Sequence, residues 1–157
     1  MMRLPLSLGQ RNKLTIMLKI LLAEWARAGI TAKHVRHAVF INEQKIAEED
    51  EWDEHDENAL HLVASLDGNP IGTARLTSDG IVGRMAVLDS FRNQGTGSAM
   101  MEQIIKTAKK SRMKELKLHA QRPAEGFYTK HGFIAEGEEF MEAGIPHIAM
   151  KLELMWQ

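Results

Sequence analysis

A glycine-containing segment between residues 92 and 98 carries the clearest chemical signal in this sequence. It reads Arg-Asn-Gln-Gly-Thr-Gly-Ser and leads from an apolar, strand-like run into an amphipathic, helix-like run. Gly95 and Gly97 would let a ligand approach the backbone, and the first amides of the following helix are free to donate hydrogen bonds. Such amides suit a phosphate or pyrophosphate, and Arg92 adds a positive charge beside them. The segment therefore predicts an anion site, although Gly-x-Gly alone fits a plain glycine turn equally well.

Two familiar nucleotide-binding loops do not match this segment. A P-loop requires Gly-Lys-Ser/Thr, and the sequence contains no Gly-Lys pair. A dinucleotide-binding fingerprint requires a third glycine, whereas Met100 stands three residues after Gly97. Neither a P-loop nor a Rossmann-type nucleotide site is expected.

The elements that must position the glycine segment alternate between strands and helices. Asp67-Gly68 is typical of a tight turn, so the apolar runs on either side of it, 60–66 and 71–76, predict a hairpin. Strands at 81–88 and 116–120 flank a helix at 97–112, and this connection predicts that the two strands are parallel. The other expected elements are a strand at 15–21, for which a helix competes, a helix at 31–41 capped by Thr31, a short helix from Pro123 to about Gly132, and strands at 133–135 and 147–154. An α/β fold with a mixed sheet follows.

The composition is that of an ordinary globular protein and limits the classes of function. The 157 residues are 44% hydrophobic and 26% charged, and we expect one domain spanning residues 1–157. Cysteine is absent, which excludes disulfides, thiolate metal sites and a cysteine nucleophile. A formal net charge of −1 argues against binding to nucleic acid or to an anionic membrane. No apolar run approaches the ~20 residues of a membrane span, and residues 1–10 lack the pattern of a secretory signal, so a cytoplasmic location is expected.

The motifs taken together resemble one protein family. Residues 92–97 resemble the acetyl-CoA motif Gln/Arg-x-x-Gly-x-Gly/Ala of the GNAT superfamily of N-acetyltransferases. Residues 121–133 are similar to that family's Asn-x-x-Ala-x-x-x-Tyr-x-x-x-Gly-Phe signature, with Gln121 in place of the asparagine. Three further stretches are similar to a bacterial subgroup of uncharacterised or ElaA-like acetyltransferases, namely 35–44, 61–64 and 144–147. The resemblance extends over about residues 14–154 and implies an α/β fold with a central mixed, mostly antiparallel β-sheet flanked by helices.

The resemblance also implies where acetyl-CoA binds, in a V-shaped opening between the strands at 81–88 and 116–120. The pyrophosphate would lie on the amides of residues 93–98, and backbone groups of Met85 and Val87 would pair with the pantetheine arm. Gln121 would either bond that arm or cap the following helix. The residues expected to bind the coenzyme are Met85, Ala86, Val87, Arg92, Asn93, Gln94, Gly95, Thr96, Gly97, Ser98, Gln121 and Tyr128.

Acetyl transfer to an amine requires a neutral nucleophile and a proton for the departing thiolate. Because no cysteine can form an acetyl intermediate, direct attack within a ternary complex is expected. By resemblance, Tyr128 donates the proton to the coenzyme sulfur; the alternative is a ring that only packs. Glu43 is the first candidate for the general base and His147 the second, while a solvated carboxylate and a backbone-capped imidazole fit the sequence equally well. No metal is expected, since His34 and His37 have no evident third ligand.

The acceptor is expected to be a small-molecule or protein amine. Eight acidic residues lie among residues 48–57. They fit either a solvated loop or a segment that attracts a cationic amine electrostatically, with Trp52 offering a cation–π face. A homodimer is consistent with the family resemblance. A different class of function also stays open, in which the same fold binds acetyl-CoA without catalysis as a sensor or interaction module.

Overall fold

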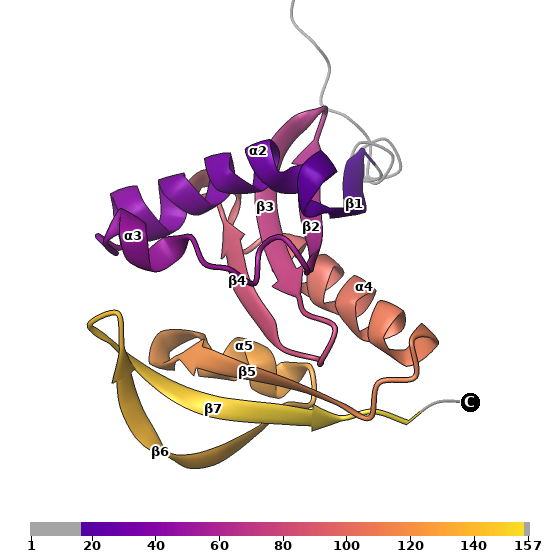
Figure 1. Ribbon diagram of the computed structural model, residues 1–157, viewed down its shortest axis with the longest axis vertical. Helices are drawn as coiled ribbons and strands as arrows, with labels where there is room; N and C mark the ends of the chain where they lie inside the picture. Colours follow the sequence, from indigo (N-terminus) through magenta and orange to yellow (C-terminus); the bar gives the residue numbers. More distant parts are fainter. Residues whose placement is uncertain (1–16, 156–157) are drawn as a thin grey trace, which may run out of the picture.

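The computed structural model describes residues 17–155, and its elements follow the predicted alternation (Figure 1). In chain order they are β1 (Leu18–Glu24), α2 (Trp25–Arg36), a π-helical segment (His37–Glu43), α3 (Glu48–Glu51), β2 (Leu60–Leu66), β3 (Asn69–Leu76), β4 (Val82–Val87), a 3-10 turn (Asp89–Phe91), α4 (Thr96–Lys110), β5 (Glu115–Gln121), a second 3-10 turn (Arg122–Ala124), α5 (Glu125–Lys130), β6 (Ile134–Glu142) and β7 (Ile145–Glu153). The strand expected at 15–21 is present as β1, and residues 15 and 16 lie outside the described residues. No helix in the described part is long and apolar enough to cross a membrane.

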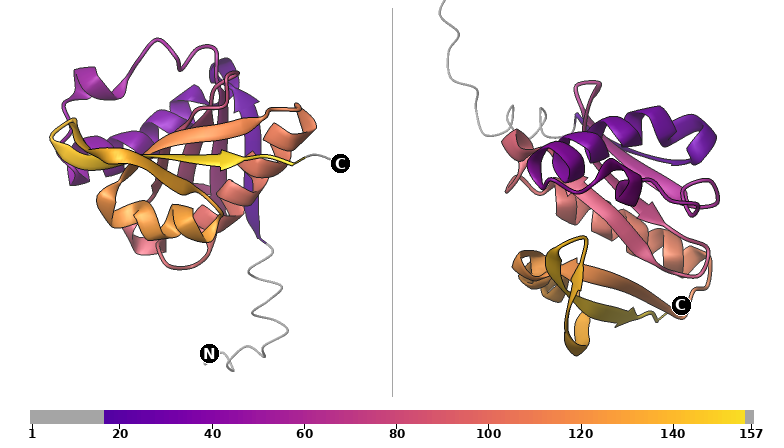
Figure 2. Two further views of the ribbon diagram at one scale, coloured as in Figure 1. Left: turned by 90° about the horizontal axis from the view of Figure 1, so that it is seen from below. Right: turned by 60° about the vertical axis from the view of Figure 1, so that its left-hand side comes forward.

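The strands form two sheets that meet at one corner. The first sheet has the order β1-β2-β3-β4 and the second has the order β5-β7-β6, with antiparallel pairing throughout. An isolated parallel bridge joins Ile81, just before β4, to Lys117 in β5. The two sheets diverge from this corner, as the right-hand view in Figure 2 shows. The predicted parallel relation of the two strands is confirmed, and the sheets together give the expected mixed, mostly antiparallel arrangement.

Helices α2 and α4 cover the two faces of the first sheet. Both helices contact β2, β3 and β4, and residues 71–76 of β3 are buried without alternation, as expected for a strand covered on both faces. The face of α4 toward the sheet carries Met100, Met101 and Ile104, which are fully buried in one cluster with Leu116. The amphipathic helix expected after the glycine segment is therefore confirmed. This packing holds the glycine segment at the beginning of α4 next to the end of β4.

The hairpin predicted from turn chemistry is also confirmed. Asp67 and Gly68 have φ angles of 51° and 81°, and they are the two residues between β2 and β3. A two-residue turn with positive φ at both positions is the type that Asp-Gly favours. Leu66 pairs with Asn69 across this turn.

Two predicted boundaries are wrong, each for a physical reason. The helix expected to begin after a Thr31 cap begins at Trp25, and Thr31 lies inside it. The packed face of the first half of α2 consists of small buried residues, Ala28 and Gly29. The sequence there therefore lacks the periodic large apolar side chains by which a helix is predicted. The strand expected at 133–135 extends over the whole of β6, because most of its residues are exposed and lack the apolar alternation that marks a strand.

Candidate active site

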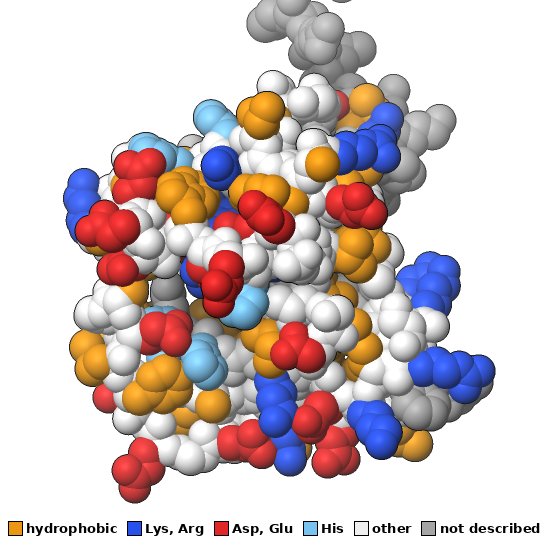
Figure 3. All heavy atoms as spheres, viewed as in Figure 1, with side chains coloured by type: hydrophobic (Ala, Val, Ile, Leu, Met, Phe, Trp, Pro, Cys, Tyr) orange, Lys and Arg blue, Asp and Glu red, His pale blue; other side chains and the backbone are white. Residues whose placement is uncertain are grey.

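The divergence of β4 and β5 opens a cleft of about 800 Å³ between the two sheets. Residues of β4 and of the segment before β2 line one wall, and residues of β5, α5 and the β6–β7 hairpin line the other. Acidic and histidine side chains gather where the upper and lower halves of the molecule meet in Figure 3. The V-shaped opening implied by the family resemblance is therefore present.

The β4 wall offers a backbone edge without a strand partner. The pairing of β3 with β4 places two residues of β4, Arg84 and Met85, opposite one residue of β3. This β-bulge gives Arg84 a φ angle of 51° and bends the strand away from regular pairing. Because β4 is the outer strand of its sheet, the edge that includes Met85, Ala86 and Val87 has no partner strand in the described residues. An extended ligand can pair with such an edge.

The predicted glycine segment forms the beginning of α4. Gly95 directly precedes the helix with a φ angle of 88°, and Asn93 has a φ angle of 61°. A Cβ on Gly95 would meet no atom within 4 Å, so glycine is favoured there by backbone conformation and not by crowding within the protein. Gly97 differs, because a Cβ there would lie 3.2 Å from the ring of Phe127. Its missing side chain lets α4 pack against α5, while the open side of Gly95 lets an anion approach the first helix amides.

The other side chains of this segment differ in accessibility. Asn93 and Gln94 are exposed, and Thr96 is buried at 4% exposure. The Oγ of Ser98 lies 3.1 Å from Nε2 of His131.

Arg92 and Glu43, which the sequence placed in separate roles, bond each other. Nη1 and Nη2 of Arg92 lie 2.7 and 2.6 Å from the two carboxylate oxygens of Glu43. Arg92 Nε also donates to the carbonyl oxygen of Val87 at 2.9 Å, which ties the guanidinium to the end of β4. Hydrogen bonds from Arg92 hold the pKa of the Glu43 carboxyl below its usual value of 4.5. Glu43 would have to leave Arg92 before it could act as a base.

Tyr128 lies on α5 and lines the cleft. Its ring packs edge-on against Phe127 and Phe133, with centroid separations of 5.1 and 6.0 Å. Burial raises the pKa of Tyr128 to about 12, so the hydroxyl stays protonated throughout the neutral range. Tyr128 therefore lines the cleft in its protonated form, and its role as proton donor stays a prediction.

Gln121 also lines the cleft and bonds a residue from the opposite side of it. Its Nε2 donates to Oε1 of Gln44 at 2.9 Å, and Nε2 of Gln44 donates back to Oε1 of Gln121 at 3.2 Å. Gln44 follows the π-helical segment and Gln121 ends β5. The two expected uses of Gln121 therefore compete with a bond that the sequence did not indicate.

His147 is the second predicted base, and it lies in the cleft wall on β7. Its side chain is 7% exposed, and its Nδ1 lies 2.7 Å from the carbonyl oxygen of Ile145. The predicted set is thus divided between two places. Met85, Gln121, Tyr128 and His147 line the cleft, whereas Glu43 pairs with Arg92 of the glycine segment, outside that lining. No group of three or more potential metal ligands in residues 17–155 is arranged to hold an ion.

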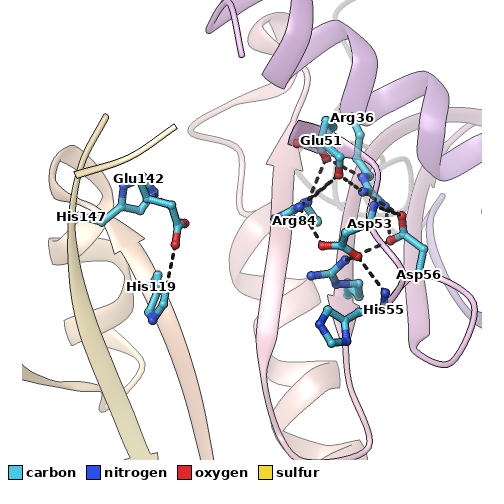
Figure 4. A network of polar contacts seen from close by, with 10 residues as sticks. Arg36, Glu51, Asp53, His55, Asp56, Arg84, His119, Glu142 and His147 are labelled. Carbon is cyan, nitrogen blue, oxygen red and sulfur yellow. Dashed lines mark hydrogen bonds and ion pairs between the residues drawn. The ribbon is translucent and has the colours of Figure 1, made fainter. Parts of the chain in front are cut away.

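Three of the eight acidic residues in segment 48–57, Glu51, Asp53 and Asp56, bond arginines that the sequence gave no reason to place there. Arg36 is fully buried and bonds Glu51 at 2.8 Å and Asp56 at 2.7 Å. Arg75 bonds Asp56 at 3.1 Å. These ion pairs join α2, β3 and the segment before β2 into one network (Figure 4). The solvated-loop interpretation is therefore wrong for Glu51 and Asp56, which are buried.

The network shifts the pKa values of its two buried carboxyls in opposite directions. Burial raises the pKa of Glu51 above its usual value, despite the nearby charges of Arg84 and Arg36. Burial alone would also raise the pKa of Asp56, but hydrogen bonds and charges from Arg36 and Arg75 outweigh it and hold the pKa below the usual 3.8. Asp56 therefore anchors the arginines as a carboxylate.

The ring of Trp52 is already in contact with cations of the chain itself. Lys33 Nζ lies 5.5 Å from the ring centroid and the Arg36 guanidinium lies 5.0 Å from it. Trp52 Nε1 donates to Glu48 at 3.4 Å. A cation–π role for Trp52 toward an incoming amine therefore has no support from these contacts.

The split sheet, the free β4 edge and the glycine turn before α4 define a protein with the acyl-CoA N-acyltransferase fold. A sequence profile described as an acetyltransferase (GNAT) domain matches residues 23–154. The chain is 36% identical over 123 residues to the uncharacterised N-acetyltransferase YjcF of Bacillus subtilis, across 76% of this chain and 88% of that protein. It is 30% identical over 129 residues to the protein ElaA of Escherichia coli, across 77% of this chain and 84% of that protein. An acyl-CoA N-acyltransferase structure from Pseudomonas aeruginosa matches with a TM-score of 0.76 and 28% identity, across 85% of this chain and 98% of that one.

The chain belongs to the GNAT acetyltransferase family. It is therefore an acyltransferase that takes its acyl group from an acyl-CoA and passes it to an acceptor. The family membership predicted from the motifs is confirmed, as is the fold.

Proposed function

We propose that this protein transfers the acetyl group of acetyl-CoA directly to a primary amine, on a small molecule or a protein, within a ternary complex. Met85 on the free β4 edge and Tyr128 line one cleft, and the glycine segment follows β4 after one 3-10 turn. The pantetheine arm would pair with the edge at residues 85–87, and the pyrophosphate would lie on the amides of residues 93–98. The divergence of β4 from β5 carries most weight, because it leaves a backbone edge unpaired beside a cleft of about 800 Å³.

The acid and the base of this reaction would both come from the second sheet's side of the cleft. Tyr128 would donate a proton to the departing thiolate, and its raised pKa keeps that proton available before the reaction. His147 is preferred to Glu43 as the base because His147 lines the cleft, whereas both oxygens of Glu43 bond Arg92. A neutral imidazole is suited to proton removal near neutral pH.

A thiol assay tests the proposal directly. Because the chain contains no cysteine, every thiol that appears when the protein is incubated with acetyl-CoA comes from released coenzyme. We expect thiol release above the amine-free rate with at least one primary amine, and none above that rate with its tertiary analogue. Mass spectrometry should then find one acetyl group on the primary amine. Stabilisation by acetyl-CoA without thiol release from any amine would overturn the proposal in favour of a non-catalytic acetyl-CoA-binding module.

A further inference from the structure

Three titratable side chains meet on one side of the second sheet, where they line the cleft: His119 of β5, Glu142 of β6 and His147 of β7 (Figure 4). The register of the sheet brings them together. Phe140 pairs with His147 and Glu142 pairs with Ile145, so Glu142 is a diagonal neighbour of His147 on the same face. The Phe140 ring lies 4.9 Å from the His119 ring and 6.0 Å from the His147 ring, which limits the movement of both imidazoles.

The backbone fixes the tautomer of His147. Its Nδ1 lies 2.7 Å from the carbonyl oxygen of Ile145, and a carbonyl oxygen can only accept a hydrogen bond. Nδ1 must therefore carry a hydrogen. In the neutral ring the other nitrogen, Nε2, is then an unprotonated acceptor.

Glu142 presents a second acceptor to the same place. His119 Nδ1 lies 2.9 Å from Oε1 of Glu142 and holds that carboxylate. Oε2 of Glu142 lies 3.6 Å from Nε2 of His147, a separation longer than a hydrogen bond. With His147 neutral, Nε2 and Oε2 are therefore two neighbouring acceptors, and neither accepts a hydrogen bond from the described residues. Glu142 is 48% exposed, so this pair is accessible from the cleft.

We propose that the cleft side of this pair is the acceptor subsite, where the ammonium group of a primary alkylamine lies beside both acceptors. An ammonium carries three N–H donors, and two of them would meet His147 Nε2 and Glu142 Oε2. His119 would act as a positioning residue, because it holds Glu142 and does not itself reach the substrate. The inference rests on the proposed acetyl transfer and adds the groups that recognise the charged form of the acceptor.

The opposite wall of the cleft does not repel a cation. Arg75 and Arg84 line it, but Arg75 bonds Asp53 at 2.6 Å and Arg84 bonds Asp53 at 3.0 Å. Figure 4 shows this arginine–carboxylate network across the cleft from Glu142. Asp50, which is exposed, adds a further carboxylate to the same wall. A positively charged acceptor would therefore meet a cleft in which the arginine charges are already compensated.

The proton balance of the reaction follows from this placement. The ammonium gives one proton to His147 Nε2 and becomes a neutral amine. The amine lone pair forms the C–N bond at the thioester carbonyl carbon, and the C–S bond breaks with its electron pair on sulfur. Tyr128 protonates the sulfur and regains a proton from solvent as the new amide nitrogen loses its second proton to solvent. His147 then releases its proton, so that an ammonium ion and acetyl-CoA give an amide, free coenzyme and one proton.

A charge-neutralising pair of variants tests the subsite. Glu142→Gln should raise the KM for a primary amine by about tenfold or more, the effect of losing a hydrogen bond to a charged group, and leave the affinity for acetyl-CoA unchanged. Glu136→Gln is the matched control, because Glu136 lies on the same strand and lines the same cleft but bonds Lys151 at 3.0 Å. His119→Ala should raise the KM less than Glu142→Gln does. If Glu142→Gln has the same amine KM as Glu136→Gln, the proposal is overturned.

A binding measurement keeps this test independent of turnover. In ¹⁵N-histidine NMR spectra we expect neutral His147 to carry its hydrogen on Nδ1, and n-propylammonium to shift its Nε2 resonance in the wild-type protein but not in Glu142→Gln. Tetramethylammonium, which has the charge but no N–H, should produce no such shift. An Nε2–H tautomer, or equal shifts from the two cations, would overturn the subsite. Specific binding of n-propylammonium without acetylation of any amine would instead contradict the proposed function and leave the subsite supported.

Discussion

The raised pKa of Tyr128 retains its proton before the reaction but makes transfer of that proton to sulfur less favourable. Burial raises its pKa to about 12, which keeps the proton in place until a thiolate forms. A thiol has an ordinary pKa of about 8.5, so complete transfer from this tyrosine to sulfur is uphill. Its contribution should therefore lie at the lower end of what a positioned acid supplies, with a hydrogen bond to the sulfur providing much of the effect.

Replacing Tyr128 by Phe isolates the hydroxyl. We expect kcat for acetyl transfer to fall by roughly 10²-fold, the lower end for a general acid, because only the proton donor is lost. The ring contacts with Phe127 and Phe133 are retained, so the melting temperature and the affinity for acetyl-CoA should change little. Steady-state kinetics and isothermal titration measure the two quantities. Wild-type kcat in this variant would assign Tyr128 to packing alone.

At the scale of residues, the sequence identified side chains but not their partners. Arg92 and Glu43 both belonged to the predicted site, yet the bond between them joins positions 49 apart and depends on the approach of the π-helical segment to the end of β4. Glu142 was missed altogether, because a glutamate in an exposed strand resembles any solvated carboxylate. The Gly144 turn was the available signal: a hairpin there would have placed residue 142 near the predicted base.

At the scale of elements, prediction succeeded where the determinants are local. The hairpin of β2 and β3 follows from Asp-Gly, and α4 follows from a regular stripe of buried apolar residues. The prediction failed for the extent of β6, because most of this strand is exposed. The turn that follows it is local, with φ angles of 51° at Ala143 and 75° at Gly144. Such a strand is specified by its pairing with β7 and not by its own pattern.

The glycine turn before α4 can be tested as an element. Gly95→Val should destabilise the protein by at least about 1 kcal/mol, because a β-branched residue strongly disfavours a φ angle of 88°. It should also abolish most of the rise in melting temperature that acetyl-CoA gives the wild type, since the turn and the approach to the first amides of α4 are both altered. Differential scanning fluorimetry with and without acetyl-CoA measures both effects.

Gly68→Val is the matched control for this turn. Gly68 has a φ angle of 81° and, like Gly95, has no atom within 4 Å of an added Cβ, but it lies in the hairpin between β2 and β3. The control should lose stability yet keep the full acetyl-CoA-induced shift. If acetyl-CoA stabilises a folded Gly95→Val protein as much as it stabilises Gly68→Val, the assignment of the pyrophosphate to this turn is wrong.

At the scale of the whole molecule, the cleft exists because β4 and β5 share a single bridge and then diverge. The isolated bridge between Ile81 and Lys117 closes one end. Beyond it, Gln44 and Gln121 exchange hydrogen bonds between residues 77 apart. The sequence predicted the parallel arrangement of the two strands from their helical connection, but the extent of their divergence follows from the bulge in β4 and from packing on both sheets.

The distribution of charge also belongs to this scale. The eight acidic residues among residues 48–57 fitted either a solvated loop or a segment that attracts a cationic amine. The fold brings Arg36, Arg75 and Arg84 to this segment from three different elements. Their positive charges neutralise carboxylates that are distant from them in the sequence. Only the folded arrangement distinguishes these two cases, since neither composition nor spacing records which arginine lies near which carboxylate.

A double-mutant cycle on Gln44 and Gln121 tests whether the two sides of the cleft are energetically coupled. Each single substitution to alanine breaks both hydrogen bonds, so the double variant should be less destabilised than the sum of the singles by about 1 kcal/mol in urea unfolding. If acetyl-CoA takes Gln121 as a partner, it must displace Gln44. Gln44→Ala should then bind acetyl-CoA at least as tightly as the wild type, whereas Gln121→Ala should bind it more weakly. Strictly additive effects on stability would mean that the Gln44–Gln121 hydrogen bonds do not couple the two sides of the cleft. Equal acetyl-CoA affinities in the two single variants would mean that the coenzyme does not displace Gln44 from Gln121.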